Sequence, residues 1–313
     1  MYKWFLVILS TLLVACGPEA RQTHAADEEV AMTVDGHARQ YWMHTPPTYQ
    51  SDRSVPLVLV LHGGQGDGHK VSEQTGFSRV SDREGFVVVY PSSIAKKTPW
   101  YDGRDTANTG IDDVVFIEAV VKDIQRKRNI DLRRVYVTGV SAGGAMTQHL
   151  ACERSDLFTA YASVIANMSF SLAKKCRPSS PVSMLLINGV ADPIMPYNGG
   201  EIRKGRRAGN GGSVMSVKQT TDFWVRNNGC GKSPARSELE DRDRRDGTRV
   251  SVAHYAQCQK GSEVRLLSIK GGGHTWPGSP MPSKGLRKRI VGVTSQDINA
   301  SDVVWSFFQQ HSR

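Results

Sequence analysis

Apolar runs separated by short polar segments recur along most of the chain. Val55–Leu61 contains no polar side chain, which is typical of a strand buried on both faces of a mostly parallel sheet. An opening antiparallel hairpin is expected where Val30–Thr33 and Arg39–His44 flank the turn signal Asp35-Gly36. Further strands are predicted at Phe86–Tyr90, Val135–Thr138, Tyr161–Ile165, Val182–Ile187, Val250–Tyr255 and Val264–Ile269.

Helices are expected between these strands, so the pattern predicts an α/β fold with helices on both faces of the sheet. The predicted helices follow Asp112-Asp113 from Val114 to about Arg128, follow the turn of Ser141 as far as Cys152, and run from Ser213 to Trp224 and from about Ser301 to Gln310. Asp112 and Asp113 stand at a helix start, where acids usually cap free N–H groups and only seldom serve as catalytic or metal ligands. The charged run from Arg236 to Arg249 is expected to be a solvated loop.

The composition narrows the class of protein. A chain of 313 residues with 39% hydrophobic and 22% charged residues fits one large globular domain. The net charge of +10 comes without any nucleic-acid motif or aromatic-interleaved basic stripe. An anionic envelope or an anionic substrate is therefore the expected partner of these charges, and nucleic acid is not.

The N-terminus is typical of an export signal. Lys3 precedes the apolar run Trp4–Val14, which is too short to span a bilayer permanently. Leu13-Val14-Ala15-Cys16 resembles a bacterial lipobox, although an ordinary signal peptide with an incidental cysteine remains the alternative. The expected organisation is a signal peptide over 1–15, a lipidated terminus and tether over 16–28, and one domain over 29–313. The protein is accordingly expected to be exported and anchored to the outer membrane through Cys16.

A strand, a sharp turn and a helix surround Gly139-Val140-Ser141-Ala142-Gly143. This segment fits the G-x-S-x-G pattern, in which glycines let the backbone turn so tightly that the serine oxygen projects alone above the sheet. Ser141 is therefore the candidate nucleophile. Its activation requires a base, an acid that orients the base, and N–H donors for the oxyanion.

The other members of such a site also follow strands. Asp192 lies just past the strand that ends at Ile187, and His274 follows a late strand on a glycine-rich loop. The order Ser141, Asp192, His274 is that of α/β-hydrolases. The backbone N–H groups of Gly64, in the loop His62-Gly63-Gly64, and of Ala142 are the predicted oxyanion donors.

These motifs resemble the bacterial feruloyl esterases and polyhydroxybutyrate depolymerase-like esterases. The resemblance extends from about Val30 to the C-terminus and includes Tyr90-Pro91, Asp192-Pro193, Asn228-Gly229-Cys230 and Gly272-Gly273-His274-Thr275-Trp276-Pro277-Gly278. It implies a single-domain serine esterase of the α/β-hydrolase fold that acts without a cofactor or metal. Gly64 stands where the depolymerases usually have a cysteine, which favours small or oligomeric esters over solid polyester.

The favoured substrates are feruloyl, other hydroxycinnamoyl or acetyl esters of plant material. Three alternatives stay open: a hydroxybutyrate oligomer depolymerase, a serine peptidase of the same fold, and a non-catalytic binding lipoprotein. Trp100 and Trp276 lie on the loops 92–112 and 276–296, Tyr197 lies directly before the loop 198–212, and all three could hold a planar group by stacking. None of these loops has a readable regular structure.

Four cysteines remain in the chain after Cys16. Cys152, Cys176, Cys230 and Cys258 suggest two disulfides in an exported protein, with neighbours in sequence paired as the first of three possible arrangements. Their spacing does not suggest a metal site.

Two basic clusters follow Asp192 and His274 and indicate either anionic substrates or an anionic membrane surface: Arg203, Lys204, Arg206 and Arg207, and Lys284, Arg287, Lys288 and Arg289.

Overall fold

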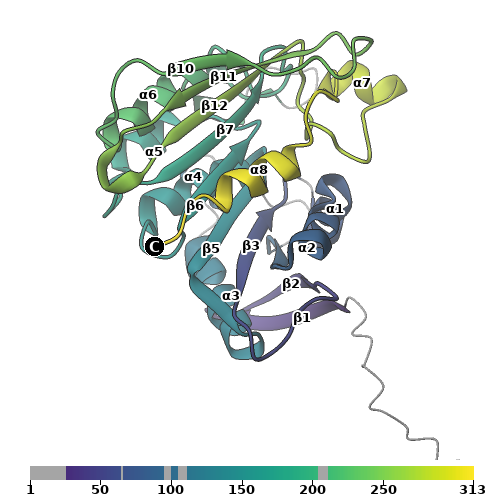
Figure 1. Cartoon of the computed structure of the whole chain (residues 1–313), viewed down its shortest axis with the longest axis vertical. Coiled ribbons are helices and arrows are strands. Elements are labelled where there is room, and N and C mark those ends of the chain that lie inside the picture. Colours follow the sequence, from purple (N-terminus) through teal and green to yellow (C-terminus); the bar gives the residue numbers. More distant parts are fainter. Residues whose placement is uncertain (1–25, 65, 95–99, 105–110, 204–210) are drawn as a thin grey trace, which may run out of the picture.

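A twisted sheet of ten strands runs through the molecule (Figure 1). The computed structural model describes residues 26–64, 66–94, 100–104, 111–203 and 211–313. Five neighbouring strand pairs in the middle of the sheet are parallel, and the pairs at both edges are antiparallel. In spatial order the strands are β1 (Ala26–Val34), β2 (His37–Thr45), β4 (Val87–Ser92), β3 (Val55–Leu61), β5 (Ile130–Val140), β6 (Ala160–Val164), β7 (Ser183–Gly189), β12 (Val264–Lys270), β11 (Arg249–Tyr255) and β10 (Ala235–Glu238).

Helices cover both faces of this sheet, as the sequence predicts. One face packs against α3 (Asp113–Lys127), α4 (Ala142–Glu153), α5 (Phe170–Lys175) and α6 (Val217–Asn227). The other packs against α1 (Gly68–Thr75), α2 (Phe77–Glu84) and α8 (Ala300–Phe308). The remaining elements are a two-stranded sheet of β8 (Gly200–Glu201) and β9 (Ser213–Val214), a 3₁₀ turn at Gln259–Gly261, and α7 (Gly285–Val291).

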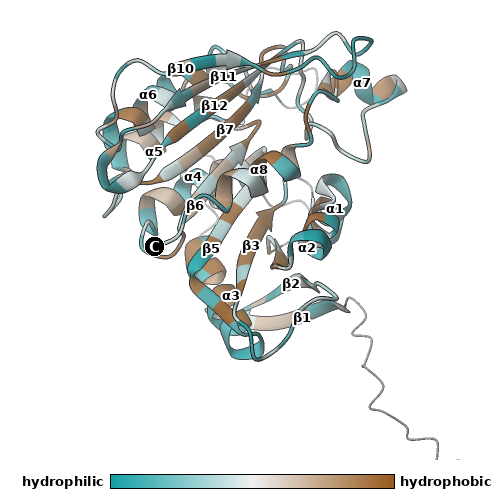
Figure 2. Ribbon diagram, viewed as in Figure 1, coloured by the Kyte–Doolittle hydropathy of each residue, from teal (hydrophilic) through white to brown (hydrophobic). Residues whose placement is uncertain are grey.

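Strand β3 shows why an uninterrupted apolar run forms a central strand. Side chains alternate between the two faces of a strand, and Leu57, Leu59 and Leu61 belong to one core while Val58 and Val60 belong to the other. All five side chains are completely buried. Both sets must be apolar because helices lie over both faces. The brown colour of β3 in Figure 2 reflects this requirement.

Four strands lead into the loops that carry the predicted site residues, and all four end at the same edge of the sheet. β3, β5, β7 and β12 run parallel to one another, so their carboxyl ends face the same way. β5 leads into Ser141, β7 into the loop of Asp192, β12 into the loop of His274, and β3 into His62. Ligands of open α/β sheets bind at this edge.

The first strand begins earlier than the sequence indicates. β1 starts at Ala26, three residues before the predicted domain boundary at 29. Asp27 accepts a hydrogen bond from His44 on β2 at 2.7 Å, and Glu28 forms an ion pair with Arg128. These polar contacts extend the hairpin into a segment whose composition predicts only a tether. Residues 1–25, including Cys16, lie outside the described chain.

Some loops contain more regular structure than predicted. The helix expected from Ser213 begins at Val217, because Ser213 pairs with Glu201 in the small sheet and Ser216 supplies the cap. Part of the charged run expected to be a loop is instead the edge strand β10, which pairs with β11. α7 lies within 276–296, where no helix was expected. Polar edge strands and exposed helices lack the apolar periodicity on which the sequence analysis depends.

The start of α3 explains the paired acids. Asp112 Oδ1 accepts hydrogen bonds from the backbone N–H groups of Val114 and Val115, which confirms the predicted cap. Asp113 has a different task, since it is buried and pairs with Arg39 of β2 at 2.5 Å. These two acids therefore secure the helix start and its attachment to the hairpin.

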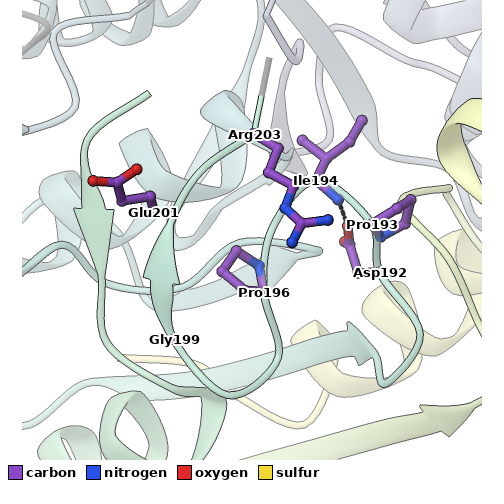
Figure 3. A pocket seen from close by; sticks show the side chains of 7 residues that line it. All are labelled: Asp192, Pro193, Ile194, Pro196, Gly199, Glu201 and Arg203. Carbon is purple, nitrogen blue, oxygen red and sulfur yellow. Dashed lines mark hydrogen bonds between the residues drawn. The ribbon is translucent and has the colours of Figure 1, made fainter. Parts of the chain in front are cut away.

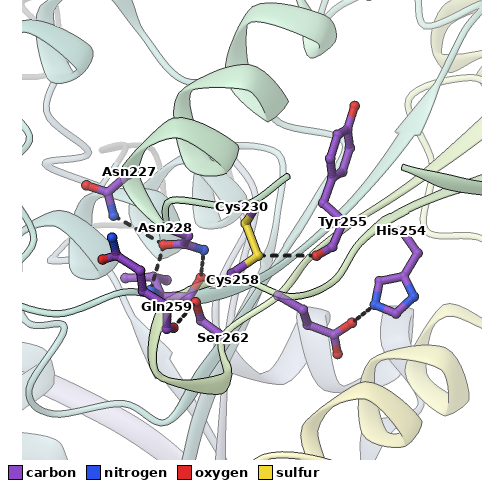
Figure 4. The surroundings of a disulfide bond; sticks show 10 residues. Asn227, Asn228, Cys230, His254, Tyr255, Cys258, Gln259 and Ser262 are labelled. Atoms are coloured by element: carbon purple, nitrogen blue, oxygen red, sulfur yellow. Dashed lines mark hydrogen bonds and ion pairs between the residues drawn. A yellow bond between two sulfur atoms is a disulfide. The ribbon is translucent and has the colours of Figure 1, made fainter. Parts of the chain in front are cut away.

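Two disulfides join neighbours in sequence, as predicted. Cys152 at the end of α4 is bonded to Cys176, and Cys230 after α6 is bonded to Cys258. Figure 4 shows the second bond between the end of α6 and the turn after β11. In the chain-entropy model each bridge contributes roughly 3 to 4 kcal/mol by restricting the unfolded chain.

Near this turn, Glu263 links the sheet edge to the C-terminus. Its carboxylate forms ion pairs with His254, with Arg265 at 2.9 Å and with His311 at 3.0 Å. Burial raises the pKa of Glu263, but the hydrogen bond from His311 and the charges of Arg265 and His254 outweigh burial and lower the pKa to about 2. Glu263 therefore stabilises the fold through its ionised form.

We expect Glu263→Gln to lower the free energy of unfolding at neutral pH by about 1 to 2 kcal/mol, because water screens part of the ionic contribution. The carboxyl titrates near 4.5 when unfolded and near 2 when folded. The stabilisation is thus complete above pH 4.5 and is lost as the pH falls toward 2. Urea unfolding at several pH values measures it, with Glu238→Gln on exposed β10 as control. A difference from wild type that persists unchanged at pH 2 contradicts the assignment.

Candidate active site

The turn after β5 places Ser141 at the carboxyl edge of the sheet. Ser141 has φ 55° and ψ −116°, a backbone conformation that residues other than glycine rarely adopt. The turn requires close backbone contact: a Cβ at Gly139 would lie 2.3 Å from Gly143 O, and a Cβ at Gly143 would lie 2.2 Å from Leu61 O. Both glycines of the G-x-S-x-G pattern are therefore required by space.

The structure brings His274 between Ser141 and Asp192. Nε2 of His274 lies 2.8 Å from Ser141 Oγ, and Nδ1 lies 2.7 Å from Asp192 Oδ2. Because a carboxylate can only accept, Nδ1–H donates to Asp192 and leaves the Nε2 lone pair for the serine hydroxyl. The side chains of His274 and Asp192 are only 10% and 2% exposed, so little water competes for these bonds.

The loop that carries Asp192 is fixed in several ways. Asp192 Oδ1 accepts hydrogen bonds from the backbone N–H groups of Ile194 and Met195, each at 2.8 Å. The side-chain amide of Asn167 donates to Pro196 O at 2.9 Å, and so ties the same loop to the segment that follows β6. The carboxylate is therefore oriented before any ligand binds.

The loop of His274 depends on a segment that sequence analysis missed. The backbone N–H of His274 donates to Val291 O at 2.5 Å, and that of Gly273 donates to Val293 O at 2.9 Å. A Cβ at Gly273 would lie 2.3 Å from Val291 O, so the close approach needs glycine. Nothing in the composition of residues 291–293 indicates this role, because it consists of backbone contacts only.

His62 holds the glycine loop after β3. Its Nε2 accepts a hydrogen bond from the backbone N–H of Ser93 at 3.0 Å, so Nδ1 carries the proton and donates to Gly63 O at 2.7 Å. Burial lowers the pKa of His62 and keeps it neutral in this position. A Cβ at Gly63 would lie 3.4 Å from Ser141 Cβ, so the loop lies against the turn of Ser141. Gln65 of this loop lies outside the described residues.

The predicted stacking role is wrong for Trp100 and Trp276. Trp100 is completely buried, and its indole N–H donates to His62 O at 2.9 Å. Trp276 is 1% exposed and donates to Ser301 Oγ at 3.2 Å. Both rings fill the interior behind the loops and offer no surface to a substrate. Tyr197 is half-buried, and its hydroxyl lies 2.6 Å from Ser268 Oγ.

A hollow of about 330 Å³ adjoins Asp192 (Figure 3). It is formed by the loop after β7 and by the start of the small sheet, and of the three site residues only Asp192 is among its described lining residues. Its charged lining residues are two acids, Asp192 and Glu201, and one base, Arg203. Lys204, Arg206 and Arg207 of the first basic cluster lie outside the described residues.

The site combines three different side chains, a hydroxyl, an imidazole and a carboxylate. Within the parts of the chain that the structure describes, no three His, Cys, Asp or Glu side chains are grouped so that they could hold a metal ion. The arrangement of a serine, an imidazole and a carboxylate is instead suited to nucleophilic attack on a carbonyl.

Comparison with known proteins identifies the family. Residues 39–192 match the family described as esterase PHB depolymerase. Over 298 residues the chain is 30% identical to the putative esterase NocK of Nocardia uniformis subsp. tsuyamanensis, and the match covers 93% of this chain and 84% of that protein. The chain belongs to the feruloyl esterase and PHB depolymerase-like esterases. It is accordingly an enzyme that hydrolyses carboxylic esters.

One relative named a feruloyl esterase is much larger than this chain. The feruloyl esterase B of Piromyces equi is 26% identical over 237 residues, which are 73% of this chain but only 41% of that protein. Among solved structures, the acetyl xylan esterase from Aspergillus awamori superposes with a TM-score of 0.58 at 16% identity, covering 80% of this chain and 94% of that one. This likeness confirms the predicted α/β-hydrolase fold.

Substitution of Gly143 tests whether the turn of Ser141 is limited by space. We expect Gly143→Ala to lower the free energy of unfolding by about 2 to 4 kcal/mol, because its Cβ overlaps the backbone of β3. Gly64→Ala is the matched control, since a Cβ there meets no atom within 4 Å. Urea unfolding of both variants is the measurement. Equal stability of the two variants would contradict the steric explanation.

Proposed function

We propose that this esterase works through an acyl-enzyme on Ser141, with His274 as the base and Asp192 as the residue that orients the base. The observation that carries the proposal is the pair of contacts at 2.8 and 2.7 Å that join the three side chains in series. Three residues far apart in sequence meet with the donor and acceptor pattern that acyl transfer requires.

In the first half of the reaction, His274 Nε2 takes the proton of Ser141 as Oγ attacks the ester carbonyl. The imidazolium then gives this proton to the alcohol that leaves, and the acyl group remains on Ser141. In the second half, the same nitrogen takes a proton from water as the water oxygen attacks the acyl carbonyl, and it returns this proton to Ser141 Oγ as the bond to Oγ breaks and the acid is released. Asp192 stays ionised throughout and stabilises the imidazolium.

The oxyanion of each tetrahedral intermediate is assigned to the backbone N–H groups of Gly64 and Ala142. Ala142 is the first residue of α4, and the first N–H groups of a helix have no partner within the helix. Gly64 directly follows Gly63, which lies against the turn of Ser141. These two positions support the assignment, and the N-terminal end of α4 adds a favourable dipole.

The proposed substrates are small or oligomeric esters of plant material, with a feruloyl, other hydroxycinnamoyl or acetyl group as the acyl part. The relatives named feruloyl esterase and acetyl xylan esterase support this class. Tyr197 is the remaining candidate for contact with a planar acyl group, since both tryptophans are buried.

We expect Ser141→Ala and His274→Ala each to lower kcat on methyl ferulate by roughly a thousandfold or more. The double variant should be no slower than either single variant, because the residues act as one unit. A fluorophosphonate probe should label the wild type and fail to label Ser141→Ala. Release of ferulate followed by absorbance, together with gel detection of the probe, provides both measurements.

Assays on further esters distinguish the proposed plant esters from hydroxybutyrate oligomers as substrates. Acetylated xylan fragments and hydroxybutyrate oligomers are assayed beside methyl ferulate, with thermal unfolding of each variant as control for folding. Full activity of Ser141→Ala would exclude the proposed nucleophile. A kcat/KM that is highest for the hydroxybutyrate oligomers would keep the nucleophile and reject the plant esters.

The N-terminal segment is proposed to make this enzyme a lipoprotein of the bacterial outer membrane. A signal peptide of residues 1–15 would be removed, Cys16 would carry the acyl chains, and a short tether would reach the domain, whose first strand begins at Ala26. Several acyl chains give stable anchoring, which one chain does not. In the described part of the chain, no helix is long and apolar enough to cross a membrane.

Replacement of the lipid acceptor tests the anchor. We expect Cys16→Ser, expressed in a bacterium with an outer membrane, to lose incorporation of labelled palmitate and to move from the salt-washed membrane fraction to the soluble fraction. Ser10→Ala, a change within the apolar run, serves as the control. Equal recovery of Cys16→Ser and wild type from salt-washed membranes would reject lipidation at Cys16.

A further inference from the structure

The segment from Met281 to Gly292 projects from the domain and contains α7. α7 has no buried residue, and every residue from Lys284 to Ile290 is exposed. In Figure 1 this helix lies at the periphery, beyond the edge of the sheet and apart from the other helices. We refer to residues 281–292 as the α7 loop.

Hydrogen bonds at its base hold the α7 loop to the domain. Ser283 Oγ donates to Gly292 O at 2.7 Å, and the backbone N–H of Ser283 donates to Thr294 Oγ1 at 3.1 Å. Ser283 and Thr294 are themselves 9% and 6% exposed. The loop is therefore a supported projection with a closed base, and its exposed side chains are presented outward.

Large apolar side chains gather on this projection. Met281 is 50% exposed, Leu286 is 69% exposed and Ile290 is 47% exposed. They are three of the seven large hydrophobic side chains that are exposed in the described chain. Leu286 and Ile290 are four residues apart and so lie on the same side of α7. Figure 2 shows brown and teal positions next to one another on α7.

The teal positions are cations. Lys284, Arg287, Lys288 and Arg289 belong to this loop, and no acidic residue lies between 281 and 294. Within the described chain none of the four forms an ion pair, whereas many other arginines do. In a helix, Arg287 and Arg289 lie on either side of the stripe formed by Leu286 and Ile290. The loop thus presents an apolar stripe bordered by unpaired positive charge.

We propose that the α7 loop is a docking surface for an anionic lipid bilayer. Exposed apolar side chains enter the boundary between headgroups and acyl chains, and long basic side chains extend to the negative headgroups around them. Each such cation near a negative surface adds to the binding. A site for a neutral partner would not need four unpaired cations, and a site for a soluble anion would not need three exposed apolar side chains. This docking is independent of the proposed hydrolysis.

The α7 loop adjoins the loop of His274, so docking would bring the bilayer close to the active site. The last residue of α7, Val291, accepts the backbone hydrogen bond of His274, and Gly292 packs against Gly273. A bilayer bound at the α7 loop would therefore lie beside the edge of the sheet that carries Ser141, Asp192 and His274. The protein would meet the membrane at this edge in addition to any anchor at its N-terminus.

Vesicle binding by an unanchored chain tests the proposal. A chain that begins at Gly17 keeps the whole sheet and both apolar cores, which lie within residues 26–313. We expect it to sediment with phosphatidylcholine vesicles that contain phosphatidylglycerol, less so at high salt, and only weakly with pure phosphatidylcholine. Leu286→Ser with Ile290→Ser, and Arg287→Glu with Arg289→Glu, should each weaken binding by roughly tenfold or more.

Matched substitutions elsewhere control for general changes of hydrophobicity and charge. Leu132→Ser alters a leucine that is 57% exposed on β5, and Lys174→Glu with Lys175→Glu alters two exposed cations of α5. Both should bind the anionic vesicles as the wild type does. Hydrolysis of a soluble short-chain ester and the melting temperature, measured for every variant, should stay unchanged.

Three results would overturn the docking proposal. The first is equal vesicle binding by the wild type and both α7 variants. The second is a raised KM for the soluble ester in the α7 variants without any change in vesicle binding, which would make the loop a substrate rim. The third is a dimer that dissociates in Leu286→Ser, seen by analytical ultracentrifugation, in a wild type that binds no vesicles. Loss of hydrolysis in Ser141→Ala tests the proposed function separately, since that variant should still bind vesicles.

Discussion

The turn between β5 and α4 is the constraint on which the site depends. Ser141 keeps a left-handed backbone conformation because Gly139 and Gly143 let the turn press against its own backbone and against β3. Such strain persists only where the surroundings determine it. Here the surroundings are the parallel neighbours β3 and β6, since Ser141 N donates to Val164 O at the end of β6. The central sheet thus fixes the nucleophile directly.

The other two side chains are held by different means. Asp192 is fixed by N–H groups of its own loop, whereas His274 is fixed by the backbone of residues 291–293, at the end of α7 and just after it. The three side chains stand on three separate strand ends, and the loops of Asp192 and His274 also support each other, since the backbone N–H of Ala191 donates to Gly272 O at 3.0 Å. The sheet and these loop contacts hold the three side chains, while the substrate is chosen by the surrounding loops, so one sheet can support esterases with different substrates.

The sequence alone was sufficient to predict the structure where burial of both faces of a strand, or a lack of space for a side chain, allows few residue types. The apolar run of β3, the hairpin signal Asp35-Gly36 and the glycines around Ser141 all belong to this kind. It was insufficient for Trp100 and Trp276, because an indole is both apolar and a donor and suits either an interior or a binding surface. Their partners, the carbonyl of His62 and the hydroxyl of Ser301, come from distant segments that no local pattern reveals.

The basic residues of the fold differ from those of the α7 loop in whether they form ion pairs. Arg39 pairs with Asp113 and so joins β2 to α3, and Arg104 pairs with Asp102 within one loop. Lys284, Arg287, Lys288 and Arg289 differ because the α7 loop offers them no acid within its own sequence. Exposed leucine and isoleucine side chains oppose solubility, and the unpaired charges beside them add nothing to packing, so a folding role does not account for this combination. The same loop supplies the carbonyl that holds His274, and its exposed face and the active site are therefore two ends of one structural unit.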